Sequence, residues 1–123
     1  MKTLQSKEDV IHLVNSFYDK VNKDELLSPI FNDIAKVKWE SHLPIMYEFW
    51  NSILLGTASY FGSPFPKHLP LPIEQKHFDR WLELFHQTVN DNFEGKLAEE
   101  AKNRATNIAQ IFSIKIKSIK SHN

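Results

Sequence analysis

The sequence predicts a single all-α domain, and three observations support that fold class. Its 123 residues suffice for one hydrophobic core, and 41% of them are hydrophobic. Apolar residues recur at intervals of three and four along four stretches, which is the period of an amphipathic helix. We find no stretch in which apolar and polar residues alternate as they do in a half-buried strand. We therefore expect residues 1–123 to form one domain of four substantial helices, with a short N-terminal extension and a C-terminal tail.

The first predicted helix begins at Ser6. Ser6 and Asp9 have the spacing of a capping box, and acidic residues there lie at the positive end of the helix dipole. The apolar stripe that follows consists of Val10, Leu13, Val14, Phe17 and Val21. Tyr18 comes directly after Phe17 and four residues after Val14, so we expect it on or beside the buried stripe.

A short segment and a second long helix come next. The segment KDELLSPIF, residues 23–31, predicts a helical turn that breaks near Pro29. The second helix is expected to begin within residues 39–42 and to run up to Gly56, which stops it. Pro44 is compatible with this helix only in its first turn; further in, it bends the helix.

His42 stands at the N-terminal end of an apolar stripe on this second helix. Met46, Phe49, Trp50 and Ile53 lie four, seven, eight and eleven residues after it. A histidine that heads an apolar helix face can point into the same apolar surroundings as the stripe.

Residues 56–76 are irregular and long for a connection inside a compact small domain, and such loops are often functional. Within them, FPKHLPLP holds His68 between Pro66 and Pro70. The prolines fix backbone angles and remove backbone donors, so we expect a stiff segment that aims His68 rather than a floppy link. The apolar residues that flank this histidine are Phe65, Leu69 and Leu71.

Two further helices complete the predicted domain. The third covers about residues 74–91, and its apolar stripe consists of Phe78, Trp81, Leu82, Phe85 and Val89. The fourth runs from about Lys96 into the C-terminal tail, and one of its faces carries Leu97, Ala101, Ala105, Ile108 and Phe112.

Composition excludes several classes of function. Lys plus Arg and Asp plus Glu both number 15, so the net charge gives no case for nucleic acid or an anionic membrane. The chain has no cysteine, which excludes disulfides, thiolate ligands and iron–sulfur clusters. The N-terminus MKTLQSKEDV lacks an apolar signal core, and no segment approaches the roughly 20 apolar residues of a membrane helix. We expect a cytoplasmic monomer.

The candidates for chemistry are histidines and aromatic residues. The sequence has no HExxH, no Gly-rich phosphate loop and no nucleophile elbow, so zinc and P-loop chemistry have little support. His68, aimed from a rigid segment into apolar surroundings, suits an axial ligand of haem iron. Nine Phe, three Trp and three Tyr would supply the wall that a flat, apolar porphyrin needs. A lone histidine near leucines is more often an ordinary surface or core residue, so a haem-free helical interaction module stays open.

The chain resembles the group III truncated haemoglobins, small bacterial globins with a two-over-two helical sandwich around haem. The resemblance covers roughly residues 8–115 and rests on four stretches in the family's order and at its intervals: FYDKVNKDELLSPIF, WESHLPIMYEFWNSILLG, YFGSPFPKHLPLP and HFDRWLELFHQTV. It implies haem b as cofactor. It also implies reversible binding of dioxygen, with nitric oxide, carbon monoxide, cyanide and peroxide as further ligands.

The resemblance also implies roles for single residues. His68 matches the proximal histidine that binds iron, and Tyr18 and Trp81 match distal residues whose O–H and N–H can donate to a polar ligand and slow its release. His42 matches a distal histidine that gates the pocket. Pro44, two residues later, departs from the family's pattern; if it shifts the helix so that His42 moves inward, His42 binds iron itself and gives a six-coordinate resting state. The other implied haem-contacting residues are Met46, Phe49, Trp50, Leu71, Phe78 and Phe85. Candidates for the haem carboxylates, by nearness in sequence, are Lys67, His77 and Arg80.

Two functions follow from a haem in such a pocket. Slow release makes the chain a poor bulk oxygen transporter and a better candidate for oxygen sequestration or oxygen chemistry. The alternative is a haem enzyme, either a nitric oxide dioxygenase or a peroxidase-like protein. Because the chain carries no flavin or nicotinamide motif of its own, such an enzyme needs a separate reductase.

Overall fold

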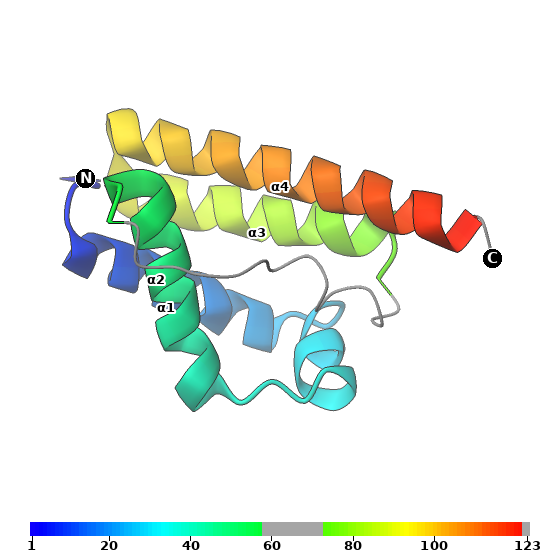
Figure 1. The fold of residues 1–123 in the computed structure, drawn as a ribbon. Coiled ribbons are helices and arrows are strands. Elements are labelled where there is room, and N and C mark those ends of the chain that lie inside the picture. Colours follow the sequence, from blue (N-terminus) through cyan, green and yellow to red (C-terminus); the bar gives the residue numbers. More distant parts are fainter. Residues whose placement is uncertain (58–72, 122–123) are drawn as a thin grey trace.

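The structure is a computed structural model that describes residues 1–57 and 73–121 (Figure 1). Helices account for most of it, which confirms the all-α prediction. The α-helices are α1 (Lys7–Lys23), α2 (Trp39–Leu55), α3 (Gln75–Asn92) and α4 (Lys96–Ser121). The remaining described elements are a π-helix, η1 (Pro29–Ile34), and the two-residue strands β1 (Lys2–Thr3) and β2 (Phe93–Glu94).

The helices pack in two crossed pairs. α3 and α4 run antiparallel and side by side, connected through β2 (Figure 1). α1 packs against both α2 and α3, and α2 crosses α1 steeply on the near side of Figure 1. η1 lies beyond the C-terminal end of α1, so it closes the end of the molecule at which α3 begins.

The start of α1 confirms the predicted capping box. Ser6 Oγ accepts from the Asp9 N–H at 3.2 Å, and Asp9 Oδ2 accepts from the N–H groups of Ser6 and Gln5 at 3.1 and 3.0 Å. Lys2 Nζ forms an ion pair with Asp9 Oδ1 at 2.7 Å. The bond from Lys2 contributes most to lowering the pKa of the buried Asp9 carboxyl, from 3.8 to about 2.

The structure adds one pair of very short strands to the predicted helices. β1 and β2 pair in parallel, with Lys2 opposite Phe93 and Thr3 opposite Glu94. A strand of two residues is too short to show alternation, so the sequence pattern could not reveal it. Gly95 follows β2 with φ of 102°, and a Cβ there would lie 3.2 Å from Thr3 Cγ2, so this turn requires glycine. The pairing ties the N-terminal segment to the α3–α4 turn.

Pro29 and Pro44 occupy different positions in their helices. The break predicted near Pro29 is wrong, because Pro29 begins η1. A proline at the first helical position loses no hydrogen bond, since an N–H there would have no partner within the helix. The Ala35 N–H bonds to the carbonyl of Ile30 at 2.9 Å, which is the five-residue spacing of a π-helix. Pro44 lies in the second turn of α2, not the first, because the helix begins at Trp39.

The core lies where α1 and α3 meet, with α2 and α4 covering it. Its largest fully buried side chains include Phe17 and Phe85, and the small residues Ala98, Ala101 and Ala105 are buried along α4. Within the described residues, no helix combines the length and the apolar character needed to cross a bilayer.

Candidate functional site

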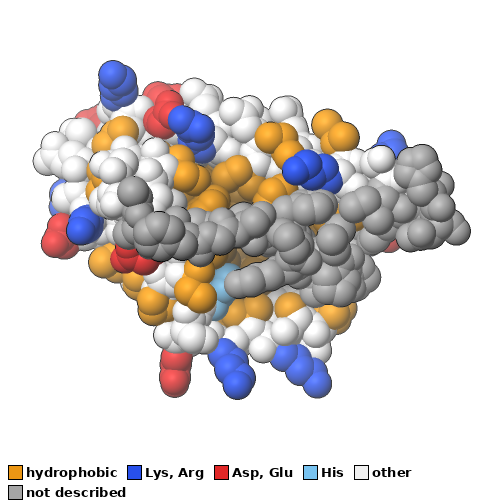
Figure 2. All heavy atoms as spheres, viewed as in Figure 1, with side chains coloured by type: hydrophobic (Ala, Val, Ile, Leu, Met, Phe, Trp, Pro, Cys, Tyr) orange, Lys and Arg blue, Asp and Glu red, His pale blue; other side chains and the backbone are white. Residues whose placement is uncertain are grey.

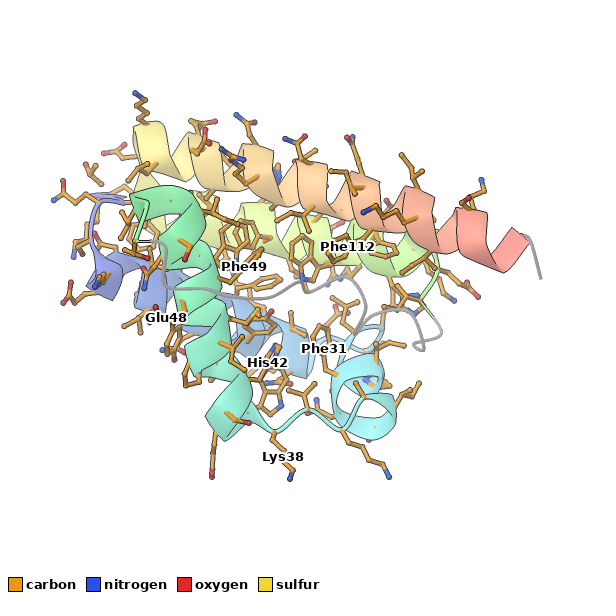
Figure 3. All side chains as sticks on the ribbon, in the orientation of Figure 1. Phe31, Lys38, His42, Glu48, Phe49 and Phe112 are labelled. Atoms are coloured by element: carbon orange, nitrogen blue, oxygen red, sulfur yellow. The ribbon has the colours of Figure 1, made fainter. Side chains whose placement is uncertain are left out.

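A cavity of about 350 Å³ lies between the helices, and all of them contribute side chains to its lining. Figure 2 shows hydrophobic side chains gathered across the middle of this face, with charged side chains mostly around its edge. Figure 3 shows His42 and Phe49 of α2, Phe31 of η1 and Phe112 of α4 around the same central region, whereas Lys38 points away from it. The described lining residues are Tyr18, Leu27, Ile30, Phe31, Ala35, Val37, His42, Ile45, Met46, Phe49, Trp50, Ile73, His77, Phe78, Trp81, Ile108, Ala109 and Phe112.

The cavity wall is apolar with a few hydrogen-bonding groups, which is the usual character of a small-molecule site. Among the described lining residues, the side chains with a polar N–H, O–H or ring nitrogen are Tyr18, His42, Trp50, His77 and Trp81. Three of them, Tyr18, His42 and Trp81, are the residues proposed from the sequence as distal groups. The structure therefore brings α1, α2 and α3 together at one cavity through those side chains.

Tyr18, in the C-terminal half of α1, lies in a cluster of rings. Its ring centroid lies 5.2 Å from that of Trp39, 5.7 Å from that of His42 and 6.0 Å from that of Phe31. Trp39 is anchored in turn, because its indole N–H donates to Asn32 Oδ1 at 2.8 Å. Burial raises the pKa of the Tyr18 phenol well above its ordinary value near 10. The phenol therefore keeps its proton at neutral pH and is available as a donor.

Trp81 packs against a second cluster of rings. Phe85 is fully buried, and it stacks on Trp81 at 5.7 Å and on Trp50 at 4.8 Å between ring centroids. Phe17 packs edge-on against both Trp81 and Phe85. Phe85 was expected to contact the cofactor, but it lies outside the described cavity lining. It fixes the two indoles that do line the cavity.

His77 and Arg80, both candidates for the haem carboxylates, occupy different positions. His77 is buried in the lining near the start of α3, and its Nδ1 accepts from the Glu74 N–H at 2.9 Å. The neutral ring therefore carries its proton on Nε2. Arg80 lies outside the lining, and its Nε donates to Asp24 Oδ1 at 2.7 Å, while its Nη1 pairs with Glu83.

Comparisons with known proteins agree with this geometry. The bacterial-like globin family matches residues 3–114. The chain is 36% identical over 111 residues to the group 3 truncated haemoglobin ctb of Campylobacter jejuni, a match that covers 87% of each protein. The crystal structure of the group III truncated haemoglobin from Campylobacter jejuni has the same fold, with a TM-score of 0.85 at 35% identity over 94% of this chain and 95% of that one.

This chain belongs to the bacterial-like globins, as a group III truncated haemoglobin. The truncated globin fold expected from the sequence resemblance is thereby confirmed. The family is one of haem-binding globins that bind gaseous ligands, and the central cavity of this globin is where both would be held. The residues present fit haem, since Phe49, Trp50, Phe78 and Phe112 offer flat apolar walls, and imidazole and phenol groups face the same space.

The remaining predicted residues of the haem site divide into two sets. Met46, Phe49, Trp50 and Phe78 line the cavity, in the region where the resemblance implies haem contact. His68 and Leu71, together with Lys67, lie outside the described residues, so their roles stay predictions.

Sequence reasoning missed two parts of the cavity wall. The first comes from residues 27–37, where Leu27, Ile30, Phe31, Ala35 and Val37 face the cavity. The second comes from α4, where Ile108, Ala109 and Phe112 do so. Ile108 and Phe112 belong to the apolar stripe that the sequence predicts for the fourth helix. Only the packing of distant segments shows that this stripe and residues 27–37 meet at one site.

Proposed function

We propose that this globin holds haem b in the central cavity and reversibly binds dioxygen and other diatomic ligands, with slow release. The proposal is carried by one observation: Tyr18 and Trp81 line the same cavity. When bound, haem supplies the iron at which a diatomic ligand is held. The residues of the chain decide how long that ligand stays.

Retention of the ligand depends on the two distal donors. Tyr18 offers a buried O–H, and Trp81 offers an indole N–H that cannot accept. In a cavity with apolar walls each such bond contributes about 1–3 kcal/mol, which slows the release of a polar ligand by about five- to hundred-fold. His42, whose ring contacts that of Tyr18, is proposed to gate access from the α2 side.

Retention of the cofactor depends on a second set of residues. His68 is proposed as the iron ligand, and Met46, Phe49, Trp50, Leu71 and Phe78 as apolar contacts of the porphyrin. For the carboxylates of haem we favour His77 over Arg80. His77 lines the cavity, whereas Arg80 lies outside the lining and its guanidinium bonds to Asp24 and Glu83.

Absorption spectra of the purified protein test the proposal. Addition of hemin should give a Soret band, and the ferric, ferrous and carbonyl forms should show distinct visible spectra. His68→Ala should lose haem or its proximal ligation. The matched control is His86→Ala, since His86 bonds to Thr106 away from the cavity lining and its loss should leave the spectra intact. A wild-type protein that takes up no hemin would refute the proposal.

A haem enzyme is the competing function, because the same two donors also suit a peroxide or a nitric oxide reaction. Such turnover needs electrons from a separate reductase, since the chain has no flavin or nicotinamide motif. Consumption of nitric oxide in the presence of a reductase, measured against the rate of autoxidation, separates the two. Consumption no faster than autoxidation leaves reversible binding as the function.

A further inference from the structure

Asp24 joins two walls of the cavity. It follows the last residue of α1, and its side chain is almost completely buried although it is a carboxylate. Its Oδ2 accepts from the N–H groups of Leu27 and Leu26 at 3.0 and 3.2 Å, and its Oδ1 accepts from Arg80 Nε at 2.7 Å. Both oxygens are therefore used, one to shape the turn that leads into η1 and the other to hold α3.

Each member of the ion pair follows or precedes a proposed distal donor by a few residues in the chain. Trp81 follows Arg80 on α3, and Tyr18 precedes Asp24 by six residues on α1. The turn that Asp24 caps carries Leu27, whose side chain is buried against the cavity, and continues into η1. A change in the distance between Asp24 and Arg80 would therefore move the Leu27 wall and the Trp81 indole relative to Tyr18.

The charges favour a fixed pair. Burial alone would raise the pKa of the Asp24 carboxyl, but the bond from Arg80 and the two backbone N–H donors outweigh it, so the pKa is lowered. The bond to Asp24 likewise raises the pKa of Arg80, with a smaller contribution from Glu83. Exposed ion pairs contribute little because water competes for both partners. Here the side chain of Asp24 is 7% exposed and that of Arg80 is 37% exposed, so water competes little for the carboxylate.

We propose that Arg80 and Asp24 are positioning residues of the distal pocket: their ion pair sets the separation of the Leu27 wall and Trp81 from Tyr18, and thereby ligand release. This inference rests on the proposed function, since it concerns the ligand that the cavity holds. Neither residue lines the cavity, so both act through the neighbours that do. Arg80 therefore acts through its bond to Asp24, and not as the contact to a haem carboxylate that its position in the sequence suggests.

Dioxygen release from the ferrous, haem-bound protein tests the inference by stopped flow. Arg80→Gln should release dioxygen about five-fold faster than wild type, the effect of weakening one distal hydrogen bond. Arg80→Lys keeps the charge but not the planar fork, so it should lie between the two. Arg104→Gln is the matched control: it removes an arginine from an exposed pair with Glu100 on α4 and should release at the wild-type rate.

A second measurement separates positioning from simple stabilisation. Urea unfolding of each haem-bound variant gives its stability, and a purely structural ion pair would lower stability without changing release from the folded protein. In a Trp81→Phe background, Arg80→Gln should add little further acceleration, because the donor that it positions is gone.

Each outcome decides between the proposals. Haem-bound Arg80→Gln that releases dioxygen at the wild-type rate overturns the positioning role alone. A wild-type chain that takes up no hemin overturns the proposed function, and the positioning role with it. If Arg80→Gln does not fold, Arg80→Lys and Asp24→Asn are measured in the same way, and wild-type release from both overturns the role.

Discussion

Replacing Tyr18 by Phe removes one oxygen atom from the cavity and little else. The aromatic ring keeps its contacts with Phe31, Trp39 and His42, because those contacts are made between rings. The side chain is 6% exposed, so the lost O–H had little access to bulk water. The substitution therefore isolates the phenol donor, and we expect the free energy of unfolding to change by no more than about 1 kcal/mol.

The size of the kinetic effect follows from that burial. A hydrogen bond donated to a polar ligand in this environment contributes about 1–3 kcal/mol, so dioxygen release should become about five- to hundred-fold faster. Carbon monoxide, which carries less charge on its outer atom, should respond less. The ratio of the two accelerations therefore reports a polar interaction rather than a change in the size of the cavity.

Stopped-flow release of both gases from the ferrous protein is the assay. Tyr47→Phe is the matched control, because the Tyr47 hydroxyl donates to Asn15 Oδ1 and its residue lies outside the described lining of the cavity. Dioxygen release at the wild-type rate from Tyr18→Phe, with unchanged spectra, would refute the donor role. Equal acceleration for both gases would show instead that the substitution had opened the cavity.

Three further predictions concern stability, each measured by urea unfolding. Phe85→Ala leaves a cavity between the two indoles against which Phe85 stacks, so it should lower the free energy of unfolding by about 3–5 kcal/mol. It should also accelerate dioxygen release, and an unchanged release rate would contradict the support of Trp81 by Phe85. Asp9→Asn should cost about 1–2 kcal/mol at pH 7. Because the folded-state pKa of about 2 lies below the ordinary 3.8, this difference should be complete above pH 3.8 and shrink as the pH falls towards 2; a difference independent of pH would refute the ion-pair account. Gly95→Ala should lower the free energy of unfolding by about 1–2 kcal/mol or more, and by more than Gly56→Ala does. Both glycines have positive φ, 102° for Gly95 and 69° for Gly56, but only at Gly95 does the added Cβ have a neighbour within 4 Å. Equal losses of stability would count against the contact with Thr3.

The long helices could be predicted from the sequence because their signals are local. The third helix was expected over about residues 74–91 and spans Gln75–Asn92, and the fourth was expected from about Lys96 and begins there. Gly56 ends α2 in the left-handed conformation that its lack of a Cβ permits. Helix caps, stop signals and the 3.6-residue period each depend on a few neighbouring residues, so a single sequence is enough to identify them.

Features that depend on distant packing could not be predicted in this way. η1 begins at a proline that reads locally as a break, and β1 pairs with a strand about 90 residues away along the chain. Residues 27–37 and α4 are far apart in the sequence, yet both line the same cavity. Arg80 was placed near haem by its position in the sequence, yet its side chain turns to Asp24, a partner 56 residues earlier.

The aromatic stripe of α3 shows where a local pattern stops determining function. Phe78, Trp81 and Phe85 lie on one helix face at intervals of three and four, so periodicity treats them as equivalent. The structure divides them: Phe78 and Trp81 reach the cavity, whereas Phe85 lies one turn further along, where α1 and α2 have closed over the helix. The same stripe thus supplies both the wall of the site and the buried ring that holds that wall. Because Phe17 packs against Trp81 without lining the cavity, a substitution of Phe17 should alter the cavity through Trp81, even where it leaves the cofactor's own contacts in place.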